Sequence, residues 1–185
     1  MIPNNPTIVC IGAHPDDIEL GCGGTLLRLF KRSRKHFVVC TAGHTGGNAI
    51  DRVVEADSAG QKLGADVSFL DFTDGKLYTE LFELIGTLTE VISKQRPDII
   101  FTHIESDHHQ DHRSVCEATL SAVRNYNGLV LGYHSWSYLS QEYDLEVSVC
   151  PKKKQEILNL FTSQWQRPYL TVHASEFFKV LKWKI

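Results

Sequence analysis

The sequence has no excess of charge of either sign and no long hydrophobic run. Its 185 residues carry 19 Lys and Arg against 22 Asp and Glu, a formal net charge of −3 that gives no electrostatic reason for nucleic acid binding. No apolar run approaches the ~18–20 residues of a membrane-spanning helix, and the opening MIPNNPT lacks the basic and apolar regions of a signal peptide. We therefore expect a cytoplasmic protein with no membrane span and no nucleic acid partner.

Paired cysteines are also missing. The five cysteines are odd in number and widely spaced, and none belongs to a CxxC motif: Cys10, Cys22, Cys40, Cys116 and Cys150. This spacing argues against a disulfide framework and against a zinc-finger site. We expect buried free thiols, because Cys10 and Cys40 lie in apolar runs typical of strands.

A phosphate-binding loop is a weak interpretation of the glycine-rich stretch GCGG at residues 21–24. The GxGxxG motif is incomplete there, and three acidic side chains, Asp16, Asp17 and Glu19, precede it. Carboxylates at this position would repel a pyrophosphate. The acidic residues therefore need another explanation.

Apolar, β-branched runs alternate along the chain with segments of helical period. Strands are predicted at 7–13, 36–43, 66–72 and 98–103, and helices at 24–33, 49–64, 80–95 and 113–125. We expect Gly23 and Gly24 to open the first of these helices. Apolar strands separated by helices predict a mostly parallel sheet covered on both faces. The expected fold class is therefore α/β, a Rossmann-like three-layer α/β/α sandwich that forms a single domain over residues 1–185.

In the C-terminal third of the sequence the turn signals and segment lengths are less regular. Strands are predicted at 128–136 and 146–150 and a last helix at 152–164. The apolar segment FFKVLKW at 177–183 suits contact with a second subunit, so a homo-oligomer is one expected state. Four aromatic or imidazole side chains could line a sugar site, although burial in the core is the interpretation we favour: His134, Trp136, Trp165 and His173.

Ionisable side chains follow each of the four predicted strands. They are His14, Asp16 and Asp17 after the first, His44 after the second, Asp71 and Asp74 after the third, and His103, Glu105, Asp107, His108, His109, Asp111 and His112 after the fourth. The carboxyl ends of parallel strands meet at one edge of the sheet, where ligands bind in open α/β folds. A structural role such as helix capping is a reasonable alternative for any one residue, but a poor one for two clusters on one rim.

The residue types on this rim are those of a catalytic metal site. A histidine and an aspartate three residues apart in a tight turn can bind one cation, and a histidine from a neighbouring loop completes a two-His, one-carboxylate set. Such a set leaves positions open for water and substrate. Zinc in this setting lowers the pKa of a water molecule towards ~7, and a carboxylate that does not bind the metal can take the proton.

Two motifs resemble those of the PIG-L or LmbE-like zinc-dependent deacetylases. They are AHPDDIELGCGGTL at 13–26 and SDHHQDHRSV at 106–115, and the segment RVVEADSAGQKLGADVSFLDFTDGKL at 52–77 is also similar to the family. The resemblance covers roughly residues 7–125. It implies removal of an acyl group, usually acetyl, from an N-acylated amino sugar or its conjugate, and hence a small-molecule substrate.

By that resemblance, three residues bind Zn²⁺ or another divalent transition metal: His14, Asp17 and His112. Asp16 matches the family's general base. His109 matches the histidine that stabilises the oxyanion, with an imidazolium as one form, and Asp111 lies where a carboxylate can orient a catalytic histidine.

Two alternatives to a sugar deacetylase stay open at this stage. One is a metal-dependent amidase whose N-acyl substrate is not a sugar, and the other is a non-catalytic relative that binds metal or sugar. Two positions also depart from the family pattern, since Glu105 replaces a common proline and His108 adds a histidine beside His109. Neither departure removes a proposed ligand.

Overall fold

One mixed sheet of seven strands forms the centre of the structure. The computed structural model describes residues 2–135, 143–166 and 172–183. Within them the strands are β1 (Ile8–Gly12), β2 (Lys35–Val39), β3 (Ala65–Phe69), β4 (Ile99–His103), β5 (Leu129–Tyr133), β6 (Leu145–Ser148) and β7 (Ser175–Trp183). Their order is β3-β2-β1-β4-β5-β7-β6; the pairs from β3 to β5 are parallel, and β7 is antiparallel to both neighbours.

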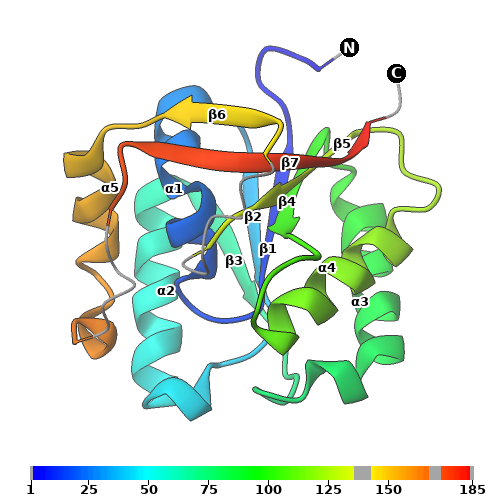
Figure 1. Ribbon diagram of the computed structural model, residues 1–185, viewed down its shortest axis with the longest axis horizontal. Coiled ribbons are helices and arrows are strands. Elements are labelled where there is room, and N and C mark those ends of the chain that lie inside the picture. The colour runs from blue at the N-terminus through cyan, green and yellow to red at the C-terminus, as the bar shows by residue number, and fades with distance from the viewer. Residues whose placement is uncertain (1, 136–142, 167–171, 184–185) are drawn as a thin grey trace.

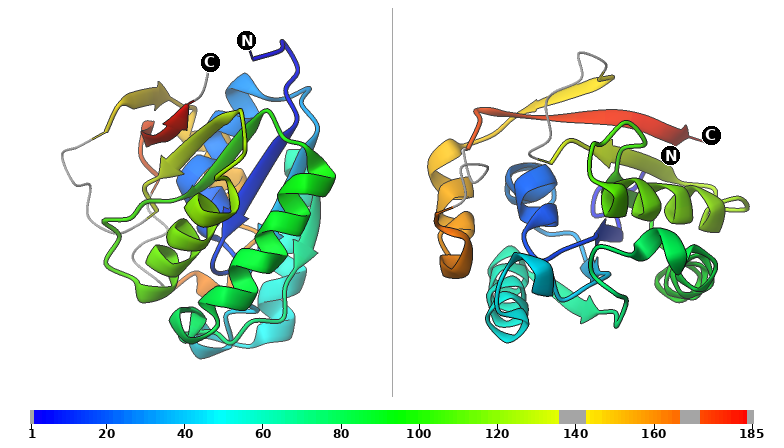
Figure 2. Two further views of the ribbon diagram at one scale, coloured as in Figure 1. Left: turned by 90° about the vertical axis from the view of Figure 1, so that its right-hand side faces the viewer. Right: turned by 60° about the horizontal axis from the view of Figure 1, so that its bottom comes forward.

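Helices cover both faces of this sheet (Figures 1 and 2). They are α1 (Asp17–Leu29), α2 (Ala49–Leu63) and α5 (Pro151–Leu158) on one face, and α3 (Leu81–Gln95) and α4 (Gln110–Ala122) on the other. The arrangement confirms the predicted three-layer α/β sandwich. No helix among the described residues is long and apolar enough to cross a membrane.

The core is divided by the sheet into two layers. Ile8 and Cys10 of β1 point towards the α1 and α2 side, whereas Val9 and Ile11 pack towards α3 and α4. Because both faces are covered, every residue of β1 is buried, which explains its unbroken apolar sequence. The prediction of buried thiols is confirmed for four of the five cysteines and wrong for Cys150, which is exposed.

Helix α1 begins earlier in the chain than the start predicted at Gly23 and Gly24. It starts at Asp17 and contains Gly23 and Gly24, so the prediction that these glycines open the helix is wrong. They permit close packing instead: a Cβ added at Gly24 would lie 2.8 Å from Cβ of Val149. The chain thus enters the helix directly from the HPDD turn, and the two aspartates sit at its first residue and the residue before it.

The C-terminal third departs furthest from the predictions. Helix α5 ends at Leu158 and is followed by a short 3₁₀ helix, η3 (Thr162–Gln164). The segment expected to contact a second subunit forms most of β7 and is inserted between β5 and β6, so it gives no support to a homo-oligomer. Of the four candidate sugar-contacting residues, His134 is buried as expected, Trp165 and His173 are exposed, and Trp136 lies outside the described residues.

A buried ion pair ties this C-terminal third to α1. Lys154 of α5 and Glu176 of β7 lie 2.6 Å apart, with side chains only 6% and 2% exposed. The Glu176 carboxylate also accepts the backbone N–H groups of Gly24 and Thr25, at 2.8 and 2.7 Å. The pair therefore links α5 and β7 to the helix that carries the HPDD turn.

We expect the Lys154→Met variant to lower the free energy of unfolding by about 3–5 kcal/mol, because it leaves the Glu176 charge buried without its partner. Urea unfolding measures this loss. Lys153→Met is the matched control, since Lys153 is exposed and adjacent. Equal stability of the two variants would show that the buried pair contributes little.

The order in which the parallel strands are added to the sheet reverses at β1, so that β1 and β4 are neighbours although they are far apart in the sequence. From β1 it runs outward through β2 to β3, then returns to place β4 on the other side of β1. In such sheets a crevice opens beyond the carboxyl ends of the two strands at the reversal. The HPDD turn follows β1 and the histidine-rich loop follows β4, so both motifs meet at this crevice.

Candidate active site

The HPDD turn is closed by its own side chains. The Asp17 carboxylate accepts the backbone N–H of His14 at 2.7 Å, which places the two side chains on the same side of the turn. Asp16 precedes α1 but its side chain makes no capping hydrogen bond to the helix. The capping alternative therefore does not account for Asp16.

The backbone of Asp16 is strained. Its φ of 103° lies in the region that residues other than glycine seldom adopt, at a cost of ~1–3 kcal/mol. Arg52 of α2, 4% exposed, holds this turn in place. Its guanidinium donates to the carbonyl oxygens of Pro15 at 2.8 Å and Gly43 at 2.7 Å, and to Oδ2 of Asp16 at 3.3 Å. The Asp16 side chain lines the pocket above the turn.

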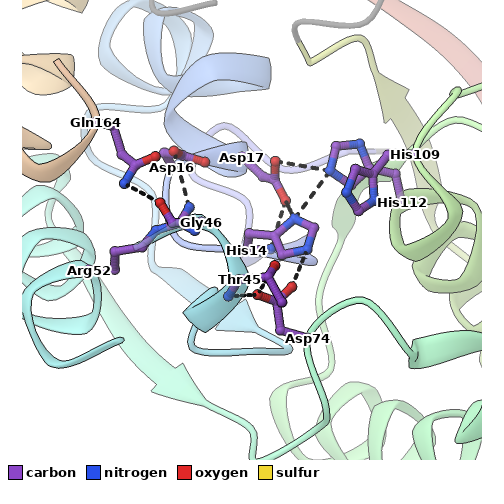
Figure 3. Close-up of a pocket in the computed structure, with 10 residues that line it drawn as sticks. All are labelled: His14, Asp16, Asp17, Thr45, Gly46, Arg52, Asp74, His109, His112 and Gln164. Atoms are coloured by element: carbon purple, nitrogen blue, oxygen red, sulfur yellow. Dashed lines mark hydrogen bonds and ion pairs between the residues drawn. The ribbon is translucent and has the colours of Figure 1, made fainter. Parts of the chain in front are cut away.

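Three side chains from the two motifs converge on one point (Figure 3). Nδ1 of His14 and Nε2 of His112 lie 3.3 Å apart, and each lies 3.3 Å from an oxygen of Asp17. Ligand atoms of a tetrahedral zinc site with bonds of 2.0–2.2 Å are separated by about 3.3–3.6 Å. The predicted ligand set is thus brought together at distances close to this range, with Oδ2 of Asp17 facing His14 and Oδ1 facing His112.

Carboxylates hold the far side of both histidines. Asp107 lies 3.0 Å from Nδ1 of His112, while Asp111 and Asp74 lie 3.2 and 3.1 Å from Nε2 of His14. Outer carboxylates of this kind fix the ring orientation and tautomer of metal-binding histidines. The histidine that Asp111 contacts is His14, and its orienting role stays a prediction. The contacts of Asp74 with His14 and of Asp107 with His112 were not predicted from the sequence.

His109 occupies the N-cap of α4, half-buried beside the three converging residues. Its Nδ1 accepts the backbone N–H of Asp111 at 3.2 Å, so the proton of the neutral ring is on Nε2. Burial and the neighbouring His112 and His14 lower the pKa of His109. An imidazolium would lose the hydrogen bond from Asp111, so the geometry favours the neutral ring over the imidazolium form.

The charges of the site attract a cation. Burial alone would lower the pKa of His112, but Asp17 and Asp107 raise it to about 9. Burial alone would raise the pKa of Asp17, but His112 and His103 hold it well below its usual range. The proton held by His112 balances part of this carboxylate charge in the absence of metal, and a bound divalent ion would replace it.

A further histidine, His103, lies behind the three converging side chains. His103 is fully buried and stacks on His112 with ring centroids 3.9 Å apart, and its Nε2 is 3.2 Å from Asp17. Three overlapping groups among the described residues have possible ligand atoms within 4.8 Å of one another: Asp17, His103 and His112; His14, His109 and His112; and His14, Asp74 and Asp111. His103 does not line the pocket, whereas His14, Asp17 and His112 all do.

The pocket above these residues has a volume of about 210 Å³ in the described structure. Its lining consists of His14, Asp16, Asp17, Thr45, Gly46, Arg52, Asp74, His109, His112 and Gln164. Sequence reasoning placed Asp74 on the rim but gave no role to Arg52, Thr45 or Gln164. Asp71, Glu105 and His108 are exposed and do not line the pocket.

We expect Asp107→Asn to weaken metal affinity by roughly 10–100-fold, because an amide cannot replace the carboxylate that orients His112. Competition with a chromogenic chelator measures the affinity. Glu105→Gln, two residues away and exposed, should leave it unchanged. Unaltered affinity in Asp107→Asn would mean that His112 is not a ligand or is oriented by other contacts.

Two sequence comparisons find relatives. The family model PIG-L, described as GlcNAc-PI de-N-acetylase, matches residues 9–123. YaiS of Escherichia coli (strain K12), named as an uncharacterized deacetylase, is 37% identical over 149 residues, which are 74% of this chain and 80% of that protein. The diacetylchitobiose deacetylase of Thermococcus kodakarensis is 31% identical over 131 residues, which are 63% of this chain and 48% of that enzyme.

A comparison with solved structures finds the same fold. The conserved protein TT1542 from Thermus thermophilus superposes with a TM-score of 0.80 at 23% identity, covering 97% of this chain and 96% of that one. At this identity the likeness supports the fold alone. The evidence on function therefore comes from the geometry of the site and from the relatives found by sequence.

Proposed function

The chain belongs to the PIG-L family, and on that premise we propose that it is a zinc-dependent hydrolase that removes an acetyl group from an N-acetylated amino sugar or amino-sugar conjugate. Both sequence relatives are named as deacetylases, which supports the reaction class. The sugar is supported by the name of the archaeal enzyme, of which this chain matches about half the length.

The strongest support for this proposal is the convergence of three possible metal-binding side chains. His14, Asp17 and His112 would hold the ion, because their two ring nitrogens lie 3.3 Å apart and each lies 3.3 Å from one of the two Asp17 oxygens, and all three residues line one pocket. When bound, the ion would supply a Lewis acid that polarises the amide carbonyl and favours ionisation of water near neutral pH.

Asp16 is the proposed general base. Its carboxylate lines the same pocket as the three ligand groups, and Arg52 fixes its direction. As water attacks the carbonyl carbon of the amide, Asp16 accepts a proton from it. When the carbon–nitrogen bond breaks, Asp16 returns that proton to the leaving nitrogen. The products are acetate and a free amine.

His109 is the proposed oxyanion donor. His109 lines the pocket, and the hydrogen bond from the backbone of Asp111 to its Nδ1 leaves the ring proton on Nε2. A neutral imidazole can donate this hydrogen bond as negative charge develops on the carbonyl oxygen, without passing its own proton on. Asp16 then carries the proton through the whole reaction.

Acetate release from a panel of compounds tests the function. The panel holds acetylated sugars, sugar nucleotides and N-acetyl amides without a sugar, each incubated with zinc-loaded protein. We expect turnover of at least one acetylated amino sugar and of none of the non-sugar amides. Turnover confined to the non-sugar amides would indicate an amidase, and zinc binding without any acetate release would indicate a non-catalytic relative.

A further inference from the structure

Strands β1 and β4 separate before either of them ends. Their parallel pairing stops at Cys10 and Phe101, although β1 continues to Gly12 and β4 to His103. On its other side β1 stays paired with β2 as far as Gly12. The separation opens the crevice at the reversal of strand order, and it also deprives the last backbone groups on this side of β1 of a strand partner.

Two side chains take the place of the missing strand partner. The Tyr133 hydroxyl donates to the carbonyl oxygen of Ile11 at 2.8 Å, and Nε2 of His103 accepts the backbone N–H of Ala13 at 3.1 Å. His103 and Tyr133 are themselves paired in register at the ends of β4 and β5. These two side chains therefore hold the end of β1 directly before the HPDD turn begins.

The His103 ring carries its proton on Nδ1. A backbone N–H can only donate, so the N–H of Ala13 requires the lone pair of Nε2. The resulting Nδ1–H is buried and has no partner among the described residues, which costs about 1–3 kcal/mol. An apolar side chain of similar size would avoid this cost. Packing alone therefore does not explain a histidine at this position.

Through its contacts His103 reaches the segments that carry all three proposed metal ligands. Ala13, whose N–H it accepts, directly precedes His14. The His103 ring stacks on His112 with the two planes 14° apart, and its Nε2 lies 3.2 Å from Oδ2 of Asp17. One side chain thus connects the HPDD turn to the histidine that follows β4.

A glycine of the first motif makes room for this arrangement. Tyr133 packs against α1 at Gly21, where an added Cβ would overlap the tyrosine ring. Any side chain at this position would displace the Tyr133 ring, whose centroid lies 4.8 Å from that of His103. The first glycine of the GCGG stretch therefore has a packing role beneath the metal site.

We propose that His103 is a positioning residue for the metal site. Its Nε2 holds the HPDD turn where His14 and Asp17 face the second motif, and its ring face holds the plane of His112. The ion itself is bound without His103. This role rests on the metal site of the proposed function, and it makes metal affinity depend on a buried residue that does not line the pocket.

The zinc affinity of two variants separates this role from a purely structural one. His103→Phe keeps an aromatic ring and removes the acceptor for the backbone of Ala13, whereas His103→Gln keeps an acceptor near the position of Nε2 and removes the ring. We expect each to weaken zinc binding by roughly 10–100-fold in competition with a chromogenic chelator. His36→Phe replaces a half-buried histidine at the far end of β2 and should leave the affinity unchanged.

Urea unfolding with and without saturating zinc gives a second readout. Zinc that binds only the folded protein stabilises it by an amount that grows with affinity. A 10–100-fold loss of affinity lowers this zinc-dependent gain by about 1.4–2.7 kcal/mol, at 1.4 kcal/mol per factor of ten. A residue with only a structural role would instead lower the stability of the metal-free protein and leave the gain from zinc unchanged.

Tyr133→Phe removes a single hydroxyl group and provides a milder test if the His103 variants do not fold. It frees the carbonyl oxygen of Ile11 and should weaken zinc binding by about threefold or more. Wild-type affinity in this variant and in every His103 variant that folds would overturn the positioning role alone.

Two further outcomes are distinguishable from that one. Failure of the wild-type protein to bind zinc would remove the proposed metal site, and the role of His103 with it. Three imidazole rings in the zinc X-ray absorption spectrum of wild type, reduced to two in His103→Phe, would show that His103 is itself a ligand and would contradict a positioning role.

Discussion

Replacing His112 with alanine is expected to remove both the metal and the activity. His112 contributes one of the three converging ligand atoms and is 1% exposed, so no water-exposed side chain can take its place. Two remaining ligands do not make a catalytic zinc site. Elemental analysis of protein purified without chelators or metal-affinity resin should give about one ion per chain for wild type and less than about a tenth for the variant.

The neighbouring histidine provides the control for this experiment. His108→Ala removes an exposed imidazole four residues away and should keep both metal and acetate release. Full metal content in His112→Ala would contradict the ligand assignment and direct attention to His103 and His109, each of which shares a group of possible ligand atoms with His112.

Replacing Asp16 with asparagine is expected to lower turnover by about 10²–10⁴-fold while metal content stays at the wild-type level. Asparagine has the shape of aspartate, tolerates the positive φ of this position and can still accept the hydrogen bond from Arg52. The variant therefore loses the proton acceptor and little else. Acetate release and elemental analysis of the same preparation measure the two quantities.

The contrast between the two variants is the informative result. His112→Ala loses metal and turnover together, and Asp16→Asn loses turnover alone. Asp71→Asn, an exposed carboxylate after β3, should match wild type in both measurements. An Asp16→Asn enzyme with full activity would exclude this residue as the base.

The rim of the sheet could be predicted because it depends on local sequence. Buried parallel strands such as β1 and β4 are unbroken apolar runs, so their ends are visible in the sequence, and polar residues directly after them must lie at one edge. That reasoning was enough to bring His14, Asp17 and His112 together. Their roles came from the family resemblance and stay predictions here.

The supporting residues could not be predicted because their partners are distant in sequence. Arg52 contacts Asp16 from 36 residues away, and Glu55 contacts Ser163 from 108 residues away. Neither contact leaves a periodic pattern in the sequence. Asp107 is closer to His112, but which carboxylate in that loop faces which histidine depends on side-chain direction.

The C-terminal strand was missed for a different reason. Only Glu176 and Phe178 of β7 are buried, and a charged residue among them breaks the apolar alternation that identifies a strand. Glu176 is buried because it pairs with Lys154 and binds the backbone of α1. A tertiary interaction thus decided the structure of a segment whose sequence suggested a surface contact.

X-ray absorption at the zinc edge identifies the atoms that bind the ion and is the decisive test of the three proposed ligands. For zinc-reconstituted protein we expect only nitrogen and oxygen ligands at about 2.0–2.2 Å, with the scattering of two imidazole rings. One of those rings should disappear in any ion retained by His112→Ala. A sulfur ligand at about 2.3 Å, or no ordered zinc site, would contradict the assignment of His14, Asp17 and His112.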